Sequence, residues 1–227
     1  MRSPSTRTSS PTASNPPRSS AVFINCPFDA EYRPLLRAMC FTILACGYVP
    51  RCALDFSDSG TVRLQQIVAL MTACGRSIHD ISRVEPDDAT GLPRFNMPLE
   101  LGADLGLRLA GPAVQRERKI LVLDSDPHRY DITLSDISGM DIEAHRKDVR
   151  SIIKVVRDWL NANRGDGPIL PGATAIAEDH AAYSKIAGDI ITALRLDPHD
   201  DLPHQDYLDV VRQALPMIEQ GRTGTVA

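Results

Sequence analysis

Short apolar runs alternate with amphipathic segments along residues 21–124 of the chain. Four runs are rich in β-favouring residues and predict strands, at residues 21–26, 48–54, 77–82 and 119–124. Three segments between them place apolar side chains at helical spacing and predict helices, at residues 30–46, 61–73 and 97–110. This alternation predicts an α/β domain with an open parallel sheet and helices on both faces.

Individual glycine, proline and acidic positions refine this prediction. Gly47 directly follows the first helical segment, where a helix commonly ends. Pro50 lacks the N–H group that an interior strand needs, so the second strand is expected at an edge of the sheet. Residues 119–124 (KILVLD) indicate a buried interior strand, because four consecutive apolar side chains lead into an aspartate.

Beyond residue 125 the pattern is less regular. Residues 128–145 are polar with scattered apolar positions and predict irregular structure. A helix is expected over residues 149–161, and a Gly/Pro-rich linker over residues 165–172. Two further helices are expected near residues 178–195 and 205–219.

The chain therefore divides into three parts. Residues 1–20 are almost entirely Ser, Thr, Pro, Arg, Ala and Asn, a composition typical of a disordered tail whose arginines are solvated. Residues 21–163 form the predicted α/β domain. Residues 164–227 form a linker and a C-terminal helical extension, which either stands apart or packs back on the domain.

The charge distribution does not favour a polyanionic partner. The 227 residues carry a net charge of −4, and the three arginines of residues 1–20 have no acid beside them, so the folded part is more acidic still. Nucleic acid is therefore not expected as a partner. No apolar run approaches the roughly 18 residues that a membrane helix needs, and no membrane association is expected.

The chain has five cysteines, an odd number, and no CxxC pair. This predicts buried free thiols in a reducing compartment, and so a cytoplasmic protein. The six histidines show no HExxH or other ligand spacing, so no metal site is predicted.

Ligands of open parallel sheets bind beyond the carboxyl ends of the strands, which selects a short set of candidates. The residues predicted to bind substrate there are Asn25, Phe28, Asp29, Asp55, Ser82 and Asn96. The sequence has no GxGxxG or GxxxxGK[ST] loop, so a dinucleotide cofactor or a kinase-type phosphate site is not expected.

Two carboxylates at this edge are candidates for catalysis. Glu100 is expected in the first turn of a helix, where the helix dipole favours the ionised form. Such a carboxylate can attack an anomeric carbon or stabilise an oxocarbenium ion, or it can simply interact with the helix amides. Asp80 ends the third predicted strand and can bind a ribose hydroxyl or brace a loop.

Three segments resemble the nucleoside 2-deoxyribosyltransferase and TIR superfamily. Residues 22–29 (VFINCPFD) resemble its first strand and exit, and residues 78–82 (IHDIS) resemble its third strand. Residues 97–102 (MPLELG) resemble the segment in which a Glu, an apolar residue and a Gly carry the nucleophile. The resemblance covers about residues 21–125. It departs at residues 93–96 (PRFN), where deoxyribosyltransferases usually have Asp-x-Gly-Thr.

The resemblance implies a flavodoxin-like fold and an enzyme, either a hydrolase or a transferase, that breaks N-glycosidic bonds of NAD or of a nucleoside or nucleotide. In that reading Glu100 acts at C1′ of the ribose, Asp80 holds a sugar hydroxyl, and Asn25 and Phe28 contact the base or sugar. NAD would be a substrate, and no cofactor is expected. Bacterial TIR-like proteins, some of which act in phage defence, imply an alternative: a non-catalytic nucleotide-sensing or self-assembling module in signalling or defence. A homo-oligomer is a possible state in either case.

Overall fold

The computed structural model describes residues 16–56, 58–83, 85–86, 91–197 and 201–223. Its centre is a five-stranded sheet in which every neighbouring pair is parallel. In spatial order the strands are β2 (Val49–Cys52), β1 (Ala21–Asn25), β3 (Arg76–Asp80), β4 (Lys119–Asp124) and β5 (Ile142–Ala144). This 2-1-3-4-5 order is that of flavodoxin-like folds, so the predicted α/β class is confirmed.

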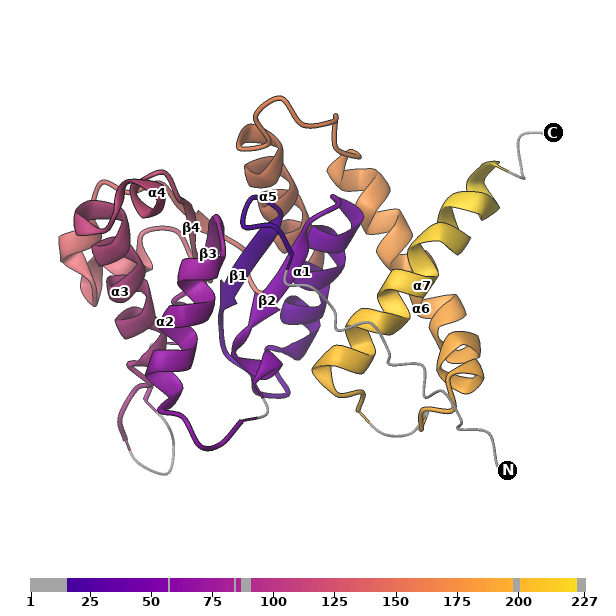
Figure 1. The fold of residues 1–227 in the computed structure, drawn as a ribbon, viewed down its shortest axis with the longest axis horizontal. Helices are drawn as coiled ribbons and strands as arrows, with labels where there is room; N and C mark the ends of the chain where they lie inside the picture. Colours follow the sequence, from indigo (N-terminus) through magenta and orange to yellow (C-terminus); the bar gives the residue numbers. More distant parts are fainter. Residues whose placement is uncertain (1–15, 57, 84, 87–90, 198–200, 224–227) are drawn as a thin grey trace, which may run out of the picture.

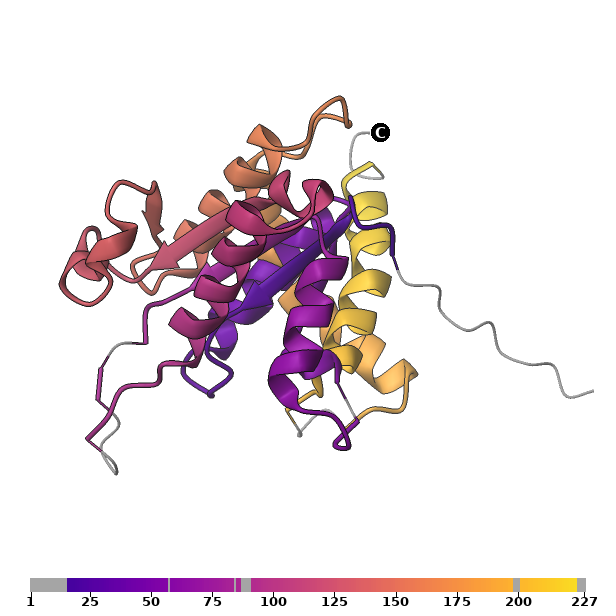
Figure 2. The same cartoon turned by 60° about the vertical axis from the view of Figure 1, so that its left-hand side comes forward.

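Helices cover both faces of the sheet, as the sequence predicts (Figure 2). All of β1 is buried, yet its side chains still alternate between two cores. Val22 and Ile24 join the core formed with α1 (Arg33–Ala45) and α5 (Val149–Ala162). On the opposite face, Ala21 and Phe23 pack with α2 (Arg63–Ala73), and β4 packs with α3 (Asn96–Ala110).

The edge and interior strands lie where the sequence predicts them. β2 pairs only with β1 among the described strands, and Pro50 sits in register with Val22 at that edge. β4 covers the predicted residues and has β3 and β5 as neighbours. Gly47 follows the end of α1 with a φ of 77°, a left-handed conformation that glycine adopts without strain.

Several short elements were not predicted. The chain leaves β2 through a 3-10 turn, η1 (Ala53–Asp55), and α3 is followed by a one-turn helix, α4 (Ala113–Arg116). The region predicted as irregular holds two 3-10 turns, η2 (Arg129–Ile132) and η3 (Ser135–Ile137), and then β5. A three-residue, half-exposed strand carries too little hydrophobic periodicity to be read from sequence.

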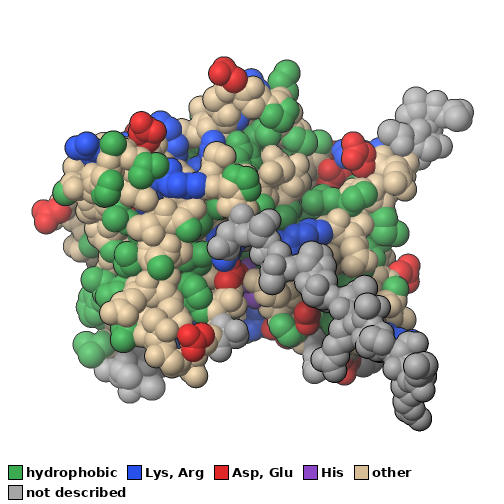
Figure 3. All heavy atoms as spheres, in the orientation of Figure 1, with side chains coloured by type: hydrophobic (Ala, Val, Ile, Leu, Met, Phe, Trp, Pro, Cys, Tyr) green, Lys and Arg blue, Asp and Glu red, His purple; other side chains and the backbone are tan. Residues whose placement is uncertain are grey.

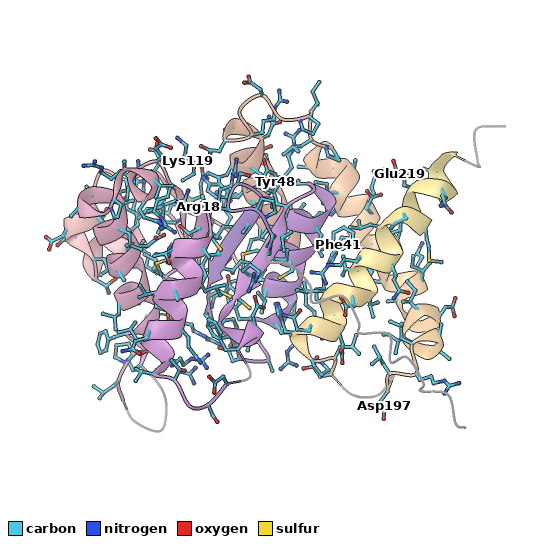
Figure 4. The ribbon with its side chains drawn as sticks, in the orientation of Figure 1. Arg18, Phe41, Tyr48, Lys119, Asp197 and Glu219 are labelled. Carbon is cyan, nitrogen blue, oxygen red and sulfur yellow. The ribbon has the colours of Figure 1, made fainter. Side chains whose placement is uncertain are left out.

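The C-terminal helices pack back on the domain. α6 (Ala173–Ala193) and α7 (His204–Thr223) are longer than predicted and form a third layer outside α1 and α5 (Figure 1). Their buried side chains belong to the same hydrophobic core as α1. Phe41 of α1, labelled in Figure 4, lies 5.7 Å from the Tyr183 ring, which lies 6.0 Å from the Tyr207 ring. The alternative of a separate appendage is therefore wrong.

Part of the predicted N-terminal tail is packed against the domain. Residues 1–15 lie outside the described residues, but residues 18–20 form a turn that leads into β1. The carbonyl oxygen of Arg18 accepts a hydrogen bond of 2.8 Å from the Gly75 amide. Its guanidinium donates to Gln115 Oε1 at 3.2 Å (Figure 4 labels Arg18). The prediction that this arginine is solvated is wrong.

Two predictions from composition can be compared directly with the structure. The five cysteines are all buried and unpaired, as predicted. Among the helices of the described residues, none has the length and hydrophobicity to span a bilayer.

Candidate functional site at the carboxyl edge of the sheet

The carboxyl ends of β1 and β3 mark the point where the strand order reverses. From β1 the chain passes first to β2 on one side and then to β3 on the other. Loops that leave two such strands in opposite directions open a crevice between them, where doubly wound folds bind ligands. Most of the predicted site residues lie on these two exits or at the start of α3.

Asp80, predicted to be catalytic, is fully buried at the end of β3. The hydroxyl of Tyr32 donates a short hydrogen bond to Asp80 Oδ2, and the Ser82 amide donates to Oδ1 at 2.8 Å. His145 Nε2 lies 3.0 Å from Oδ2. With both oxygens engaged and no exposed surface, Asp80 is placed to hold Tyr32 and His145 and not to touch a substrate. Its predicted contact with a sugar hydroxyl is not supported by this geometry.

His145 lies between the Lys147 amide and the Asp80 carboxylate. Its Nδ1 accepts a hydrogen bond of 3.0 Å from the Lys147 amide, so the ring proton is on Nε2, facing Asp80. The side chain is 1% exposed. His145 therefore braces the end of β5 against β3.

A cleft of about 240 Å³ opens beside this cluster. It lies between the start of α1, the exit of β3 and the exit of β5. Its polar lining residues are Glu31, Tyr32, Ser82, Arg83, Glu85, His145 and Lys147. Of the predicted substrate-binding residues, Ser82 lines this cleft.

Charged groups at the rim of the crevice are paired with one another. Arg83 contacts Asp29 at 2.9 Å and Glu31 at 2.9 Å. The Tyr32 amide donates to Asp29 Oδ1 at 2.9 Å. Although partial burial opposes it, the bonds from Arg83 and from this amide lower the pKa of Asp29. Asp29 thus fixes the loop after β1, which limits its freedom to bind substrate.

Asn25 belongs to a second network, on the α3 face of the sheet. Its Nδ2 donates to the Met97 carbonyl at 2.9 Å and contacts His79 Nδ1 at 3.0 Å. His79 Nε2 lies 2.9 Å from Asp104 Oδ2 of α3. Because Asn25 is 3% exposed and its amide hydrogens are engaged, it ties β1 to the start of α3. The predicted contact with base or sugar is again not supported by this geometry.

The same network ends in a buried ion pair. Arg118 Nε lies 2.6 Å from Asp104 Oδ1, and both side chains are fully buried. Arg118 also donates to Gln115 Oε1 at 2.7 Å and to the Met71 carbonyl at 2.9 Å. Burial lowers the pKa of Arg118, while the Asp104 carboxylate opposes that shift. This ion pair anchors α3, and with it Glu100, to the sheet.

Glu100 is half-buried on α3 and was predicted to be ionised by the helix dipole. The helix begins at Asn96, with Phe95 as its cap, so Glu100 lies beyond the first turn, where the dipole has largely faded. Burial instead raises its pKa to about 7, and the charge of Arg63 at the start of α2 limits the rise. A carboxyl with this pKa can both give and accept a proton near neutral pH.

Cys26 directly follows β1 and is near both candidate carboxylates. Burial raises the pKa of its thiol well above the ordinary value, with further contributions from Cys52, Asp80, Cys40 and Glu100. Asp80 and Glu100 therefore lie near the exit of β1 but belong to opposite faces of the sheet.

The other predicted residues are spread along the same edge. Phe28 is half-buried and packs against the cores of both faces, whereas Asn96 is exposed at the start of α3. Asp55 lies farther away, on η1 beside β2, where Arg51 Nε contacts its Oδ2 at 2.6 Å.

Four residues of these networks were missed by sequence reasoning: Tyr32, Asp104, Arg118 and His145. Tyr32 follows Asp29 by three residues, a spacing that suits a capping aspartate and offers a weak signal. His145 closes a region predicted as irregular, and nothing in its sequence context indicates that it reaches Asp80. No protein-family model matches this chain, and none of the curated proteins matches its sequence.

Proposed function

We propose that the protein acts on the N-glycosidic bond of NAD or of another nucleoside or nucleotide, with Glu100 as its acting carboxyl. One observation carries this proposal: a half-buried carboxyl whose pKa is about 7, on the first helix after the strand-order reversal. Partial burial leaves it reachable by a ligand, whereas Asp80 and Asn25 are enclosed. The resemblance of residues 97–102 to the nucleophile segment of the deoxyribosyltransferase and TIR superfamily is in line with this role.

Glu100 could serve the reaction in either of two protonation states. As a carboxylate it would attack C1′ of the ribose, forming a glycosyl ester while the base leaves with the bonding electron pair. Water would then cleave the ester at C1′ and release the ribose. As a carboxylic acid it would instead protonate the departing base. Phe28 and Asn96 are the predicted residues best placed to contact the substrate, while Asp80 and Asn25 act as positioning residues.

The test is to incubate the purified full chain with NAD and a panel of nucleosides and nucleotides, following base release by chromatography. Glu100→Gln should abolish release, while Gln in place of the exposed Glu117 should leave it unchanged. If ionised Glu100 attacks, kcat should rise with pH through about 7. If the acid form protonates the base, kcat should fall over the same range. Full turnover by Glu100→Gln would contradict the proposal.

A second candidate is a non-catalytic module that binds a nucleotide or self-associates. Large hydrophobic side chains are exposed near the starts of α2 and α3: Val62 (63%), Leu64 (44%), Leu92 (63%), Phe95 (66%) and Leu99 (57%). Figure 3 shows hydrophobic side chains on the lower left, where α3 and the loop before it lie. Exposed apolar surface of this kind favours a protein contact, such as a homo-oligomer. Ligand binding without base release, with a dimer or larger species by light scattering, would support this candidate.

The proposed setting is the cytoplasm. Five buried, unpaired thiols in one chain are typical of a reducing compartment. The acidic net charge supports a small-molecule ligand and not nucleic acid as partner.

A further inference from the structure

Three side chains that are distant in sequence converge beside β2. Cys52 ends β2, Asp55 lies on η1, and His204 is the first residue of α7. Cys52 Sγ lies 3.3 Å from His204 Nε2, which lies 3.8 Å from Asp55 Oδ1. The three donor atoms all lie within 4.8 Å of one another. The Cys52 residue is fully buried, and the side chains of Asp55 and His204 are 6% and 7% exposed.

We propose that Cys52, Asp55 and His204 form a binding site for a zinc-like divalent cation. A thiolate, an imidazole nitrogen and a carboxylate oxygen are ligands that Zn²⁺ accepts together in tetrahedral sites. With metal–ligand bonds of about 2.0–2.3 Å, tetrahedral donors lie roughly 3.3–3.6 Å apart. The separations of 3.3 Å and 3.8 Å are close to that range. The thiolate and carboxylate would supply two negative charges, of which the carboxylate's is shared with Arg51.

The three side chains are arranged as metal ligands and not as a catalytic relay that activates a cysteine nucleophile. In a Cys–His–Asp relay the thiol and the carboxylate contact different nitrogens of the imidazole. Here Cys52 Sγ and Asp55 Oδ1 both approach His204 Nε2. Burial also raises the pKa of Cys52 to about 12, so without a metal the thiol keeps its proton and is a poor nucleophile. A bound cation would displace that proton.

Neighbouring groups hold the carboxylate in a ligating orientation. Arg51 Nε contacts Asp55 Oδ2 at 2.6 Å, which leaves Oδ1 on the side of His204. Gln205 Nε2 donates to Oδ1 at 2.8 Å. A carboxylate oxygen has two lone pairs, so Oδ1 can accept this bond and still bind a metal. Outer groups that fix a ligand in this way are a regular part of metal sites.

One of the three proposed ligands, His204, borders a cavity. A cavity of about 210 Å³ lies beside His204 and is also lined by Cys40, Phe28 and Leu54. Three protein ligands and an accessible fourth position, filled by water, are typical of zinc sites that bind or activate a small ligand. The Cys40 thiol lies near this cluster. Burial is the main cause that raises the pKa of Cys40, and Cys52 raises it further.

The site would also fasten the C-terminal layer to the sheet. Asp55 and His204 are separated by 149 residues in the chain, and the ligands come from β2, η1 and α7. A cation that binds only the folded chain stabilises the folded state, so it would oppose detachment of α7 from the sheet. This role is independent of Glu100, so the metal site and the proposed glycosidic activity can fail separately.

The test uses the full chain, reduced and stripped of metal, titrated with Zn²⁺ and separately with Co²⁺. We expect one equivalent of Zn²⁺ per chain, a rise in Tm on binding, and a thiolate-to-cobalt charge-transfer band. Cys52→Ala should remove that band, and His204→Ala should weaken Zn²⁺ binding by roughly 100-fold or more. The matched controls are Cys74→Ala, a buried thiol outside the cluster, and His128→Ala, an exposed histidine.

Two results would overturn the proposal. One is failure of the wild-type chain to bind Zn²⁺ at micromolar concentration. The other is equal Zn²⁺ affinity in His204→Ala and His128→Ala. If Cys52→Ala does not fold, judged by circular dichroism, Asp55→Asn and His204→Ala decide the question through the zinc-dependent rise in Tm.

Discussion

The Asp80 carboxylate lies 3.0 Å from the ring nitrogen Nε2 of His145, joining the ends of β3 and β5 across the intervening strand β4. Tyr32 adds the start of α1 to the same carboxylate. Burial, with the nearby Asp80 charge, raises the pKa of Tyr32 well above its ordinary value, so the phenol remains a donor. One aspartate therefore fixes three segments that border the crevice.

Replacing Asp80 should lower the free energy of unfolding substantially. Asp80→Ala leaves the Tyr32 hydroxyl and the Ser82 amide facing a buried space without their acceptor, and it removes the carboxylate beside His145 Nε2. Removing one partner of such a buried network costs about 3–5 kcal/mol of unfolding free energy. Urea denaturation should show this loss. Tyr32→Phe, which removes a single donor, should cost about 1 kcal/mol, and equal losses in the two variants would contradict this account.

Glu100 should make the stability of the protein depend on pH. Its pKa is near 7 in the folded chain and about 4.5 when unfolded, so between these values the folded state holds a proton that the unfolded state has released. Stability should therefore fall as pH rises from about 4.5 to 7. The full shift is reduced by solvent screening at this half-exposed side chain, leaving about 1–2 kcal/mol.

The measurement is urea unfolding at pH 5 and pH 8. Glu100→Gln should be more stable than wild type at pH 8, and the difference should shrink at pH 5. The exposed Glu117→Gln should follow wild type at both pH values. If Glu100→Gln parallels Glu117→Gln, the carboxyl is not titrating near neutrality.

The sheet was largely predictable, because β1 and β4 are continuous apolar runs and its edge strand carries Pro50. β5 was not, because three partly exposed residues between η3 and α5 produce no periodic signal. The packing of α6 and α7 on α1 was one of two open alternatives. Both helices carry an apolar face, but the partner of such a face is a tertiary property.

The position of the candidate site could be predicted from the sequence, but the roles of its individual residues could not. The residues at the strand ends were found because every parallel strand ends at the same edge. The sequence could not show that Asn25 and Asp80 make their hydrogen bonds inside the protein, because the partners Met97 and Tyr32 are far from them in the chain. The proposed metal ligands could not be predicted from the sequence either. Cys52 and His204 are 152 positions apart, whereas sequence motifs for metal sites detect only ligands that are close together in the chain.

The buried pair of Asp104 and Arg118 should show strong energetic coupling. Asp104→Ala leaves a buried guanidinium without its carboxylate and should cost about 3–5 kcal/mol. Replacing both residues with apolar ones, as Asp104→Leu with Arg118→Met, removes both charges and should cost less than the sum of the single changes. A double-mutant cycle by chemical denaturation measures this difference, and additive losses would show that the two charges are not coupled.

Substitutions of Tyr207 should show whether α6 and α7 unfold together with the α/β domain. The residue is 3% exposed, its ring packs against Tyr183, and its hydroxyl donates to the Arg37 carbonyl of α1 at 2.8 Å. Tyr207→Ala removes an aromatic side chain from the shared core and should cost about 3–5 kcal/mol, in one cooperative transition. Tyr207→Phe keeps the ring, loses one hydrogen bond and should cost about 1 kcal/mol. A separate early transition for α6 and α7 in Tyr207→Ala, with the α/β domain unchanged, would instead mean that the third layer folds as an independent unit.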